Sequence, residues 1–195
     1  QYGHVVGRMI PLPLDGEPYE FEDNIVSGRI PGEYIPAVNK GFIEAMKKGP
    51  VAGYEIVGVK MCLDDGSFHA VDSSEMAFRI CARDAFHEAF RTTKPCLLEP
   101  IMKVEIEMPT EHQGPIVGDL NSRRGMIMST ENKGTLTVVM ADVPLSNMFG
   151  YATVARGLSK GMATFTMEMS HYAPVPNKLA EEIIARRREE QAAKK

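Results

Sequence analysis

The clearest pattern of hydrophobic and polar positions lies in the second half of the chain. Between residues 102 and 108, methionine, valine and isoleucine alternate with lysine and glutamate, which is typical of a strand with one buried face. Pro115 opens a predicted short helix. Two predicted strands around the turn Asn132–Gly134, a helix from about residue 146 to 158 and a strand over residues 163–169 follow. This order, β-α-β-β-α-β over roughly 75 residues, predicts a ferredoxin-like domain.

The first half of the chain alternates less regularly. Residues 4–10 and 19–30 are predicted strands joined by a bend rich in proline and glycine, and residues 54–63 are a third. A helix with Pro36 in its first turn precedes the third strand, and a longer helix follows it and ends before Pro95.

The two patterns predict an α+β protein with two domains. We expect the first domain over residues 1–96 and the second over residues 97–195, where a C-terminal helix follows the ferredoxin-like fold. A length of 195 residues suits two such domains.

Composition narrows the class of protein. Apolar residues make up 44% and charged residues 25%, as in an ordinary soluble globular protein, and no apolar run approaches the length of about 18 residues that a membrane span needs. The three cysteines form no C-x-x-C pattern, which indicates a reducing, cytoplasmic setting. The net charge of −4 argues against a general nucleic-acid coat, so any RNA contact should be local.

One polar cluster precedes the longer helix. His69, Asp72 and Ser73 have the residue types of a hydrolase triad, but triad members normally come from distant segments. We favour a capped helix instead, in which Asp72 is the cap and Glu75 reaches back to its N–H group. The five histidines are scattered, so we expect no metal site, and the absence of a phosphate-binding glycine motif predicts no nucleotide site in this chain.

Two sets of basic residues have two interpretations each. One edge of the longer helix carries Arg79, Arg83, His87 and Arg91. This edge is predicted to be a solvated face partly paired with neighbouring carboxylates, and the alternative is a stripe that tracks RNA phosphates. Arg123 and Arg124, at the end of the short helix, have the same two interpretations.

Six longer stretches are too specific to be generic motifs. They are QYGHV (1–5), IPGEYIPAVNKGF (30–42), DGSFHAVDSSEMAF (65–78), LLEPIMKVE (97–105), GDLNSRRG (118–125) and VPLSNMFGYAT (143–153). In this order they resemble the fourth and fifth domains of the bacterial elongation factor G family, from Gln1 to about Ala185. The resemblance implies that the first domain is an elongated βαβ arm with an unusual crossover, similar to a ribosomal-protein fold.

The resemblance also implies a function. The family are translational GTPases that drive tRNA–mRNA translocation on the ribosome and, with the ribosome recycling factor, split ribosomes after termination. GTP and magnesium would bind in N-terminal domains outside this sequence, so we expect no cofactor and no enzymatic activity in this stretch. A start at Gln1, directly at a strand-like segment, is expected of a piece of a longer protein. We further expect a cytoplasmic monomer without a membrane partner.

The resemblance assigns contact residues to the tip of the arm, which enters the small-subunit decoding region behind the moving tRNA. One of its two loops ends at Gln1, and the other matches residues 65–72, with His69 at the position that is modified in the archaeal and eukaryotic counterpart. The residues expected to contact RNA at the tip are Gln1, Gly66, Ser67, Phe68 and His69. The second domain is expected near the GTPase-associated rRNA of the large subunit, with Arg123 and Arg124 as candidate contacts.

Four alternatives remain open or are disfavoured. A paralogue specialised for ribosome splitting would share these domains, whereas a relative that protects ribosomes from tetracycline typically has different tip loops. A small-molecule kinase can share the fold of the first domain, but it would need a Gly/Ser-rich phosphate loop that the sequence lacks. A free-standing RNA-binding module is the last alternative, and the start at Gln1 counts against it.

Overall fold

The computed structural model describes residues 1–193 and contains two compact units. The first unit comprises Gln1–Cys96 with the C-terminal segment that begins at Pro176, and the second unit is Leu97–Val175. Each unit has a sheet covered by helices, so the predicted α+β class is confirmed. The division into functional domains at residue 97 stays a prediction.

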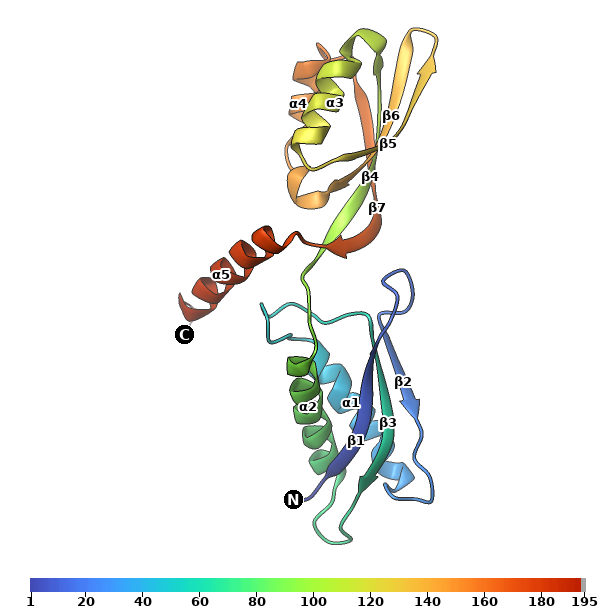
Figure 1. The fold of residues 1–195 in the computed structure, drawn as a ribbon, viewed down its shortest axis with the longest axis vertical. Helices are drawn as coiled ribbons and strands as arrows, with labels where there is room; N and C mark the ends of the chain where they lie inside the picture. Colours follow the sequence, from blue (N-terminus) through green and yellow to red (C-terminus); the bar gives the residue numbers. More distant parts are fainter. Residues whose placement is uncertain (194–195) are drawn as a thin grey trace. The chain divides into compact units, whose positions relative to one another are not determined.

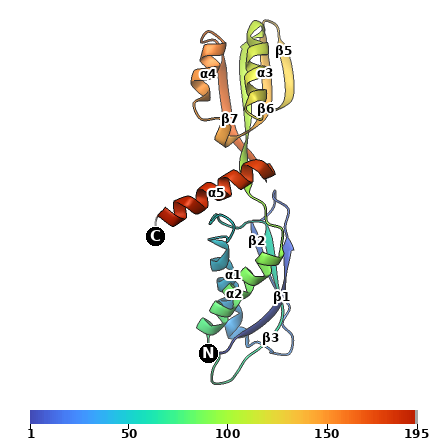
Figure 2. The same ribbon diagram turned by 60° about the vertical axis from the view of Figure 1, so that its left-hand side comes forward.

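The first unit is a mixed three-stranded sheet with two helices on one face (Figures 1 and 2). The central strand β3 (Val59–Ser67) pairs antiparallel with β1 (His4–Pro11) and parallel with β2 (Tyr19–Asp23). A 3-10 turn (Gly32–Tyr34) and helix α1 (Ile35–Met46) connect β2 to β3, and helix α2 (Glu75–Thr92) follows β3.

Aromatic side chains fill the core between these helices and the sheet. The ring centroids of Phe42 in α1 and Phe86 in α2 lie 6.4 Å apart, and the Phe86 ring stacks on the Phe90 ring. The two helices approach closely at Gly41, where an added Cβ would lie 2.3 Å from the carbonyl oxygen of Arg79. The absence of a side chain at Gly41 is therefore what allows this helix pair to pack.

Two strands of the first unit begin or end at other residues than the sequence predicted. The strand predicted over residues 19–30 ends at Asp23, whose side chain accepts a hydrogen bond from the Ile25 N–H, and Gly28 has a positive φ of 65°. Both features favour a turn. The strand predicted over residues 54–63 begins only at Val59 and continues to Ser67, because the expected loop residues pair with β1.

The second unit has the predicted βαββαβ order. Its four strands form an antiparallel sheet in the order β5-β6-β4-β7, and α3 and α4 cover one face (Figures 1 and 2). The elements are β4 (Leu98–Pro109), α3 (Gln113–Ser122), β5 (Met126–Lys133), β6 (Leu136–Pro144), α4 (Tyr151–Leu158) and β7 (Thr164–Pro174), with 3-10 turns at Thr110–His112 and Leu145–Asn147. Helix α4 begins later than the predicted residue 146, because Gly150 has a φ of 74° and interrupts the helical backbone.

The C-terminal helix α5 (Asn177–Ala193) contacts the segment between α1 and β3. The Arg187 guanidinium lies 4.9 Å from the centroid of the Tyr54 ring, and Gln191 Nε2 donates to the carbonyl of Ala52 over 3.3 Å. None of the helices formed by residues 1–193 is long and apolar enough to cross a membrane.

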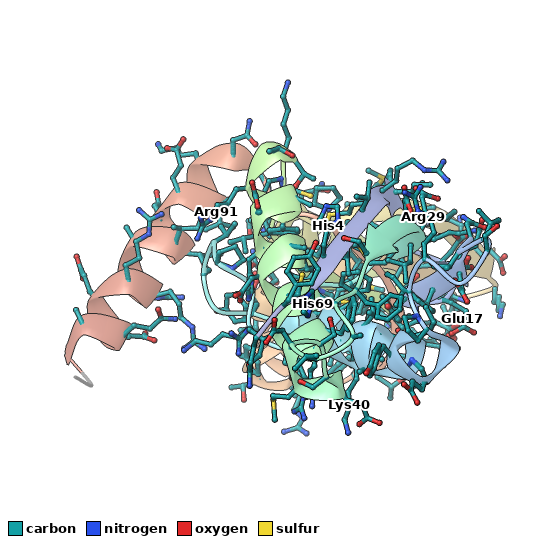
Figure 3. The ribbon with its side chains drawn as sticks, turned by 90° about the horizontal axis from the view of Figure 1, so that it is seen from below. His4, Glu17, Arg29, Lys40, His69 and Arg91 are labelled. Atoms are coloured by element: carbon teal, nitrogen blue, oxygen red, sulfur yellow. The ribbon has the colours of Figure 1, made fainter. Side chains whose placement is uncertain are left out.

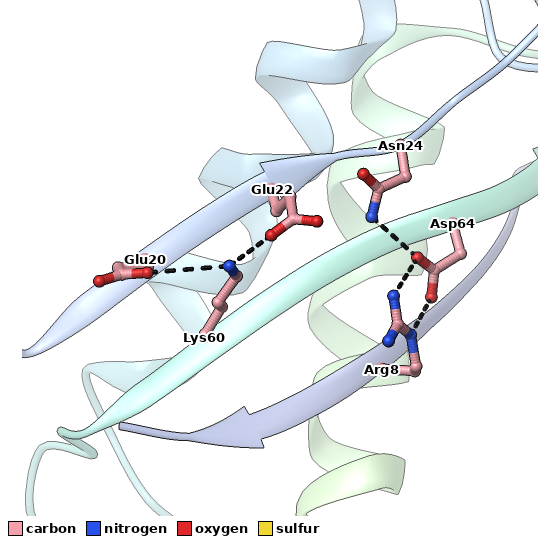
Figure 4. A network of polar contacts seen from close by, with 6 residues as sticks. All are labelled: Arg8, Glu20, Glu22, Asn24, Lys60 and Asp64. Atoms are coloured by element: carbon pink, nitrogen blue, oxygen red, sulfur yellow. Dashed lines mark hydrogen bonds and ion pairs between the residues drawn. The ribbon is translucent and has the colours of Figure 1, made fainter. Parts of the chain in front are cut away.

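A network of charged side chains covers the other face of the first sheet (Figure 4). Arg8 donates to both oxygens of Asp64 over 2.7 and 2.9 Å, and Asn24 donates to Asp64 over 3.0 Å. These hydrogen bonds lower the pKa of Asp64 from 3.8 to about 2, and the hydrogen bond from Arg8 has the largest effect. On the same face Lys60 pairs with Glu22 and lies 3.9 Å from Glu20.

Replacing Gly41 by alanine is expected to lower the free energy of unfolding of the first unit by about 1–3 kcal/mol, because the added Cβ collides with the backbone of α2. Gly118, inside α3, is the matched control: nothing lies within 4 Å of its added Cβ. Gly118→Ala should therefore stabilise its helix by about 0.5–1 kcal/mol. Urea titrations followed by circular dichroism measure both, and equal effects of the two changes would contradict the packing argument.

The Asp64 network predicts a dependence of stability on pH. A carboxyl group with a lowered pKa stabilises the folded chain above its unfolded pKa, and that contribution is lost as the pH falls through the folded value. For Asp64 the loss should occur between about pH 4 and pH 2. Asp64→Asn should be less stable than the unmodified chain at pH 6 and lose less stability over this window. Urea midpoints from pH 2 to 6 test this, with Asp15→Asn in an exposed bend as the control.

Candidate functional site

The first unit brings two segments together at one end. The N-terminus and the loop between β3 and α2 both lie at the end shown at the bottom of Figure 1. We call residues 1–3 and 67–74 the tip. Figure 3, a view from below, labels His69 in the loop and His4 in the neighbouring strand.

Ser67 joins the ends of the two strands at the tip. Its hydroxyl lies 2.7 Å from the Tyr2 hydroxyl and 3.1 Å from His4 Nδ1. The adjacent Gly66 is buried, and an added Cβ would lie 2.4 Å from the His4 carbonyl oxygen and 2.5 Å from the side chain of Ile30. Gly66 therefore has a packing role in this unit, and contact of Gly66 with RNA stays a prediction.

The tip presents apolar side chains, an imidazole and one carboxylate, Asp72, to solvent. Phe68 is 44% exposed, Val71 is 84% exposed and the His69 side chain is 57% exposed. His69 Nδ1 accepts hydrogen bonds from the backbone N–H groups of Val71 (3.4 Å) and Asp72 (3.3 Å). The Nδ1 side of the ring thus faces its own loop, and the exposed ring has Nε2 as its other polar atom.

Asp72 does not cap α2, which corrects the prediction. The N-cap is Ser74, whose hydroxyl accepts from the Ala77 N–H over 3.1 Å. Glu75 is the first helical residue, one position after the cap, so it is not at the third position from which a capping box reaches back. The Asp72 carboxylate instead lies 3.1 Å from His69 Nδ1.

The three residue types of a hydrolase triad do meet at the tip, but in the wrong arrangement. The Ser73 hydroxyl accepts from the His69 backbone N–H and donates to the Tyr2 carbonyl oxygen, each over 2.9 Å, so it is bound to backbone atoms on both sides. A nucleophile must instead be hydrogen-bonded to the imidazole. The geometry supports no acyl-transfer chemistry.

We also considered a groove beside α2 and possible metal sites. A groove between β1 and α2 is lined by small and apolar residues with acidic residues at its rim; its lining is Gln1, Gly3, Val5, Ala77, Ile80, Cys81, Asp84, Ala85 and Glu88. Within residues 1–193, no three His, Cys, Asp or Glu side chains gather in a way that would hold a metal ion.

The arginines predicted as alternative RNA contacts have partners inside the fold. Arg123 donates to Asp119 over 2.6 Å and to the Asn147 carbonyl over 2.7 Å, and its guanidinium lies 5.0 Å from the centroid of the Tyr151 ring. Arg124 donates to both oxygens of Glu99, whose side chain is only 11% exposed. The two residues hold the end of α3 to α4 and β4.

The edge of α2 is also partly neutralised. Arg79 binds the carboxylate of Glu44 on α1, and Arg83 lies 3.1 Å from Asp84. This pairing supports the solvated-face interpretation of the edge over the phosphate-tracking one.

Comparison with known proteins accounts for nearly the whole chain. Residues 1–94 match the sequence family described as elongation factor G, domain IV, and residues 96–183 match elongation factor G C-terminus. The chain belongs to the elongation factor G family. Elongation factor G of Fervidobacterium nodosum is 56% identical over 94% of the chain and 26% of that protein, and the Rhodopirellula baltica protein is 49% identical over 99% and 28%.

A solved structure agrees with the fold. A crystal structure of a protein from Thermus thermophilus is 41% identical, covers 97% of this chain and 28% of its own, and superposes with a TM-score of 0.89. The chain spans about a quarter of the length of the elongation factor G proteins it matches. The tip lies in the part that matches domain IV, and Arg123 and Arg124 lie in the part that matches the C-terminus.

Sequence reasoning did not assign a role in linking the two segments to Tyr2, Ser73 or the adjacent His4. Tyr2, His4 and Ser73 all bond across the two segments, but nothing in the local pattern distinguishes them. The alternation of Tyr2 and His4, which places both on one side of an extended segment, was the one available signal.

Arg124→Ala is expected to lower the free energy of unfolding by about 1–3 kcal/mol, because the poorly exposed Glu99 carboxylate loses its partner. Arg156→Ala, at an exposed position of α4, is the matched control and should change stability by no more than about 0.5 kcal/mol. Thermal unfolding of the chain measures both. An Arg124→Ala variant as stable as the control would show that this ion pair does not support the fold.

Proposed function

We propose that the chain is the ribosome-contacting C-terminal part of a translation elongation factor that promotes GTP-dependent translocation of tRNA and mRNA and takes part in ribosome recycling. The observation that carries the proposal is the consecutive match of residues 1–94 and 96–183 to two regions of elongation factor G. In this proposal residues 1–96 form the arm domain, and residues 97–195 form the second domain.

The tip is the part of the arm that acts on RNA in this proposal. Its proposed working residues are Gln1, Gly66, Ser67, Phe68 and His69, which would enter the small-subunit decoding region. His69 suits such a contact because its ring is exposed and its Nδ1 is held by contacts within the loop, to the Val71 and Asp72 N–H groups and the Asp72 carboxylate, so that Nε2 is the ring nitrogen proposed to bind RNA. When protonated, Nε2 donates to a phosphate or ribose oxygen, and the flat ring of Phe68 stacks on a base.

The second domain would then lie near the GTPase-associated rRNA of the large subunit. Direct contact by Arg123 and Arg124 stays a prediction, and their internal partners support an indirect role, in which they fix the surface that α3 and α4 present. GTP and magnesium would bind in domains outside these residues, and the ribosome recycling factor would be a partner of the complete protein. The setting would be the cytoplasm and the protein a monomer.

In the full-length factor that carries this chain, His69→Ala is expected to slow translocation about tenfold or more, through loss of a hydrogen bond to a charged or polar RNA group. Ribosome-stimulated GTP hydrolysis should stay within about twofold, because the tip has no part in that chemistry. Rapid-mixing assays of both rates on one ribosome preparation provide the measurement. His171→Ala, at an exposed histidine of β7, is the control and should change neither rate. An equal loss of both rates after His69→Ala would contradict the proposed separation of roles.

A further inference from the structure

Ser73 uses its backbone N–H, its hydroxyl proton and one hydroxyl lone pair for hydrogen bonds at the tip. Its N–H donates to the His69 carbonyl over 3.0 Å, and its hydroxyl accepts from the His69 N–H over 2.9 Å, which closes the loop around His69. The hydroxyl proton is directed to the Tyr2 carbonyl oxygen, also over 2.9 Å. A hydroxyl group has one proton to donate, so this side chain cannot bond Tyr2 and donate elsewhere at the same time.

The backbone of Tyr2 is held from the same loop at both of its polar groups. The Tyr2 N–H donates to the Asp72 carbonyl over 2.8 Å, and the Tyr2 carbonyl accepts the Ser73 hydroxyl. These bonds join the segment that starts at Gln1 to the loop that carries His69, although the two are about 70 positions apart in the chain. The Ser73 hydroxyl oxygen thus bonds backbone groups of both segments, in addition to the contact between the hydroxyls of Ser67 and Tyr2.

We propose that Ser73 is a positioning residue that couples the two segments of the tip, so that residues 1–3 and the loop carrying His69 keep one fixed arrangement. The importance of this coupling for RNA contact rests on the proposed function, but the coupling itself is a property of the chain alone. The neighbouring Ser74 has a separate task, because its hydroxyl binds the Ala77 N–H inside α2. Two adjacent serines thus serve the loop and the helix independently.

The deciding experiment is site-resolved NMR of the 195-residue chain with Ser73→Ala, Ser73→Thr and Ser74→Ala. In Ser73→Ala the His69 amide should exchange with solvent about tenfold faster, because its acceptor is gone. The carbonyl carbon shift of Tyr2 should change as well, because its donor is gone. Ser73→Thr keeps a hydroxyl group and should restore both signals.

Ser74→Ala is the matched control for a general effect on the helix. It should speed exchange of the Ala77 amide and leave the His69 amide and the Tyr2 carbonyl unchanged. Unaltered His69 and Tyr2 signals in Ser73→Ala would overturn the proposal, and so would an equal acceleration at His69 and at the buried Phe86 of α2, which indicates general destabilisation.

Translocation by the full-length factor separates this proposal from the proposed function. Ser73→Ala should slow translocation, Ser73→Thr should restore it, and adding Ser73→Ala to His69→Ala should cause little further loss, because both changes affect one unit. If His69→Ala and Ser73→Ala both left translocation unchanged, the proposed function would fail, and the NMR result would still decide whether Ser73 couples the two segments.

Discussion

The antiparallel pairing of β1 with β3 is the constraint on which the tip depends. The register sets His4 opposite Ser67, so the two strands finish together and the segments beyond them converge. The register shifts between Val6 and Gly7, and an added Cβ at Gly7 would lie 2.2 Å from the carbonyl oxygen of Cys62. A larger residue there would force the strands apart, and a slip by one residue would turn every side chain of β1 to the opposite face. The contacts among Tyr2, His4 and Ser67 would then be lost.

Helix packing secures the other side of the tip loop. Helix α2 begins directly after the loop, and its position is fixed by the close approach of α1 at Gly41 and by the buried rings of Phe78 and Phe86. Because Ser74 caps the helix with its own hydroxyl, the preceding residues are free to make loop contacts. Tertiary packing thus supplies the rigidity that short loops lack in isolation.

The sequence predicted the parts of this protein whose structure is encoded locally. The alternation over residues 102–108 was sufficient to predict a half-buried strand, and the turn residues around it gave the βαββαβ order. The strand expected over residues 19–30 failed, because Asp23 bonds to its own backbone and ends the pairing. The cap of α2 was misplaced because Asp72 and Ser74 are equally good cap residues, and only the contacts of Asp72 with His69 and Tyr2 separate them. Contacts across 70 positions leave no periodic signal.

Basic side chains are distributed differently at the tip and in the rest of the fold. Neither Lys nor Arg occurs in residues 1–3 or 67–74, whereas Arg8, Arg79 and Arg124 are each paired with a carboxylate of the fold. Affinity for RNA that arises from counterion release grows with the number of cations placed against phosphates. If the tip contacts RNA as proposed, it adds little to that part of the affinity, because it has no such cations. In the proposed function the tip would recognise shape and hydrogen-bonding groups once other parts of the protein have bound, which requires a fixed arrangement of a few side chains rather than a cluster of cations.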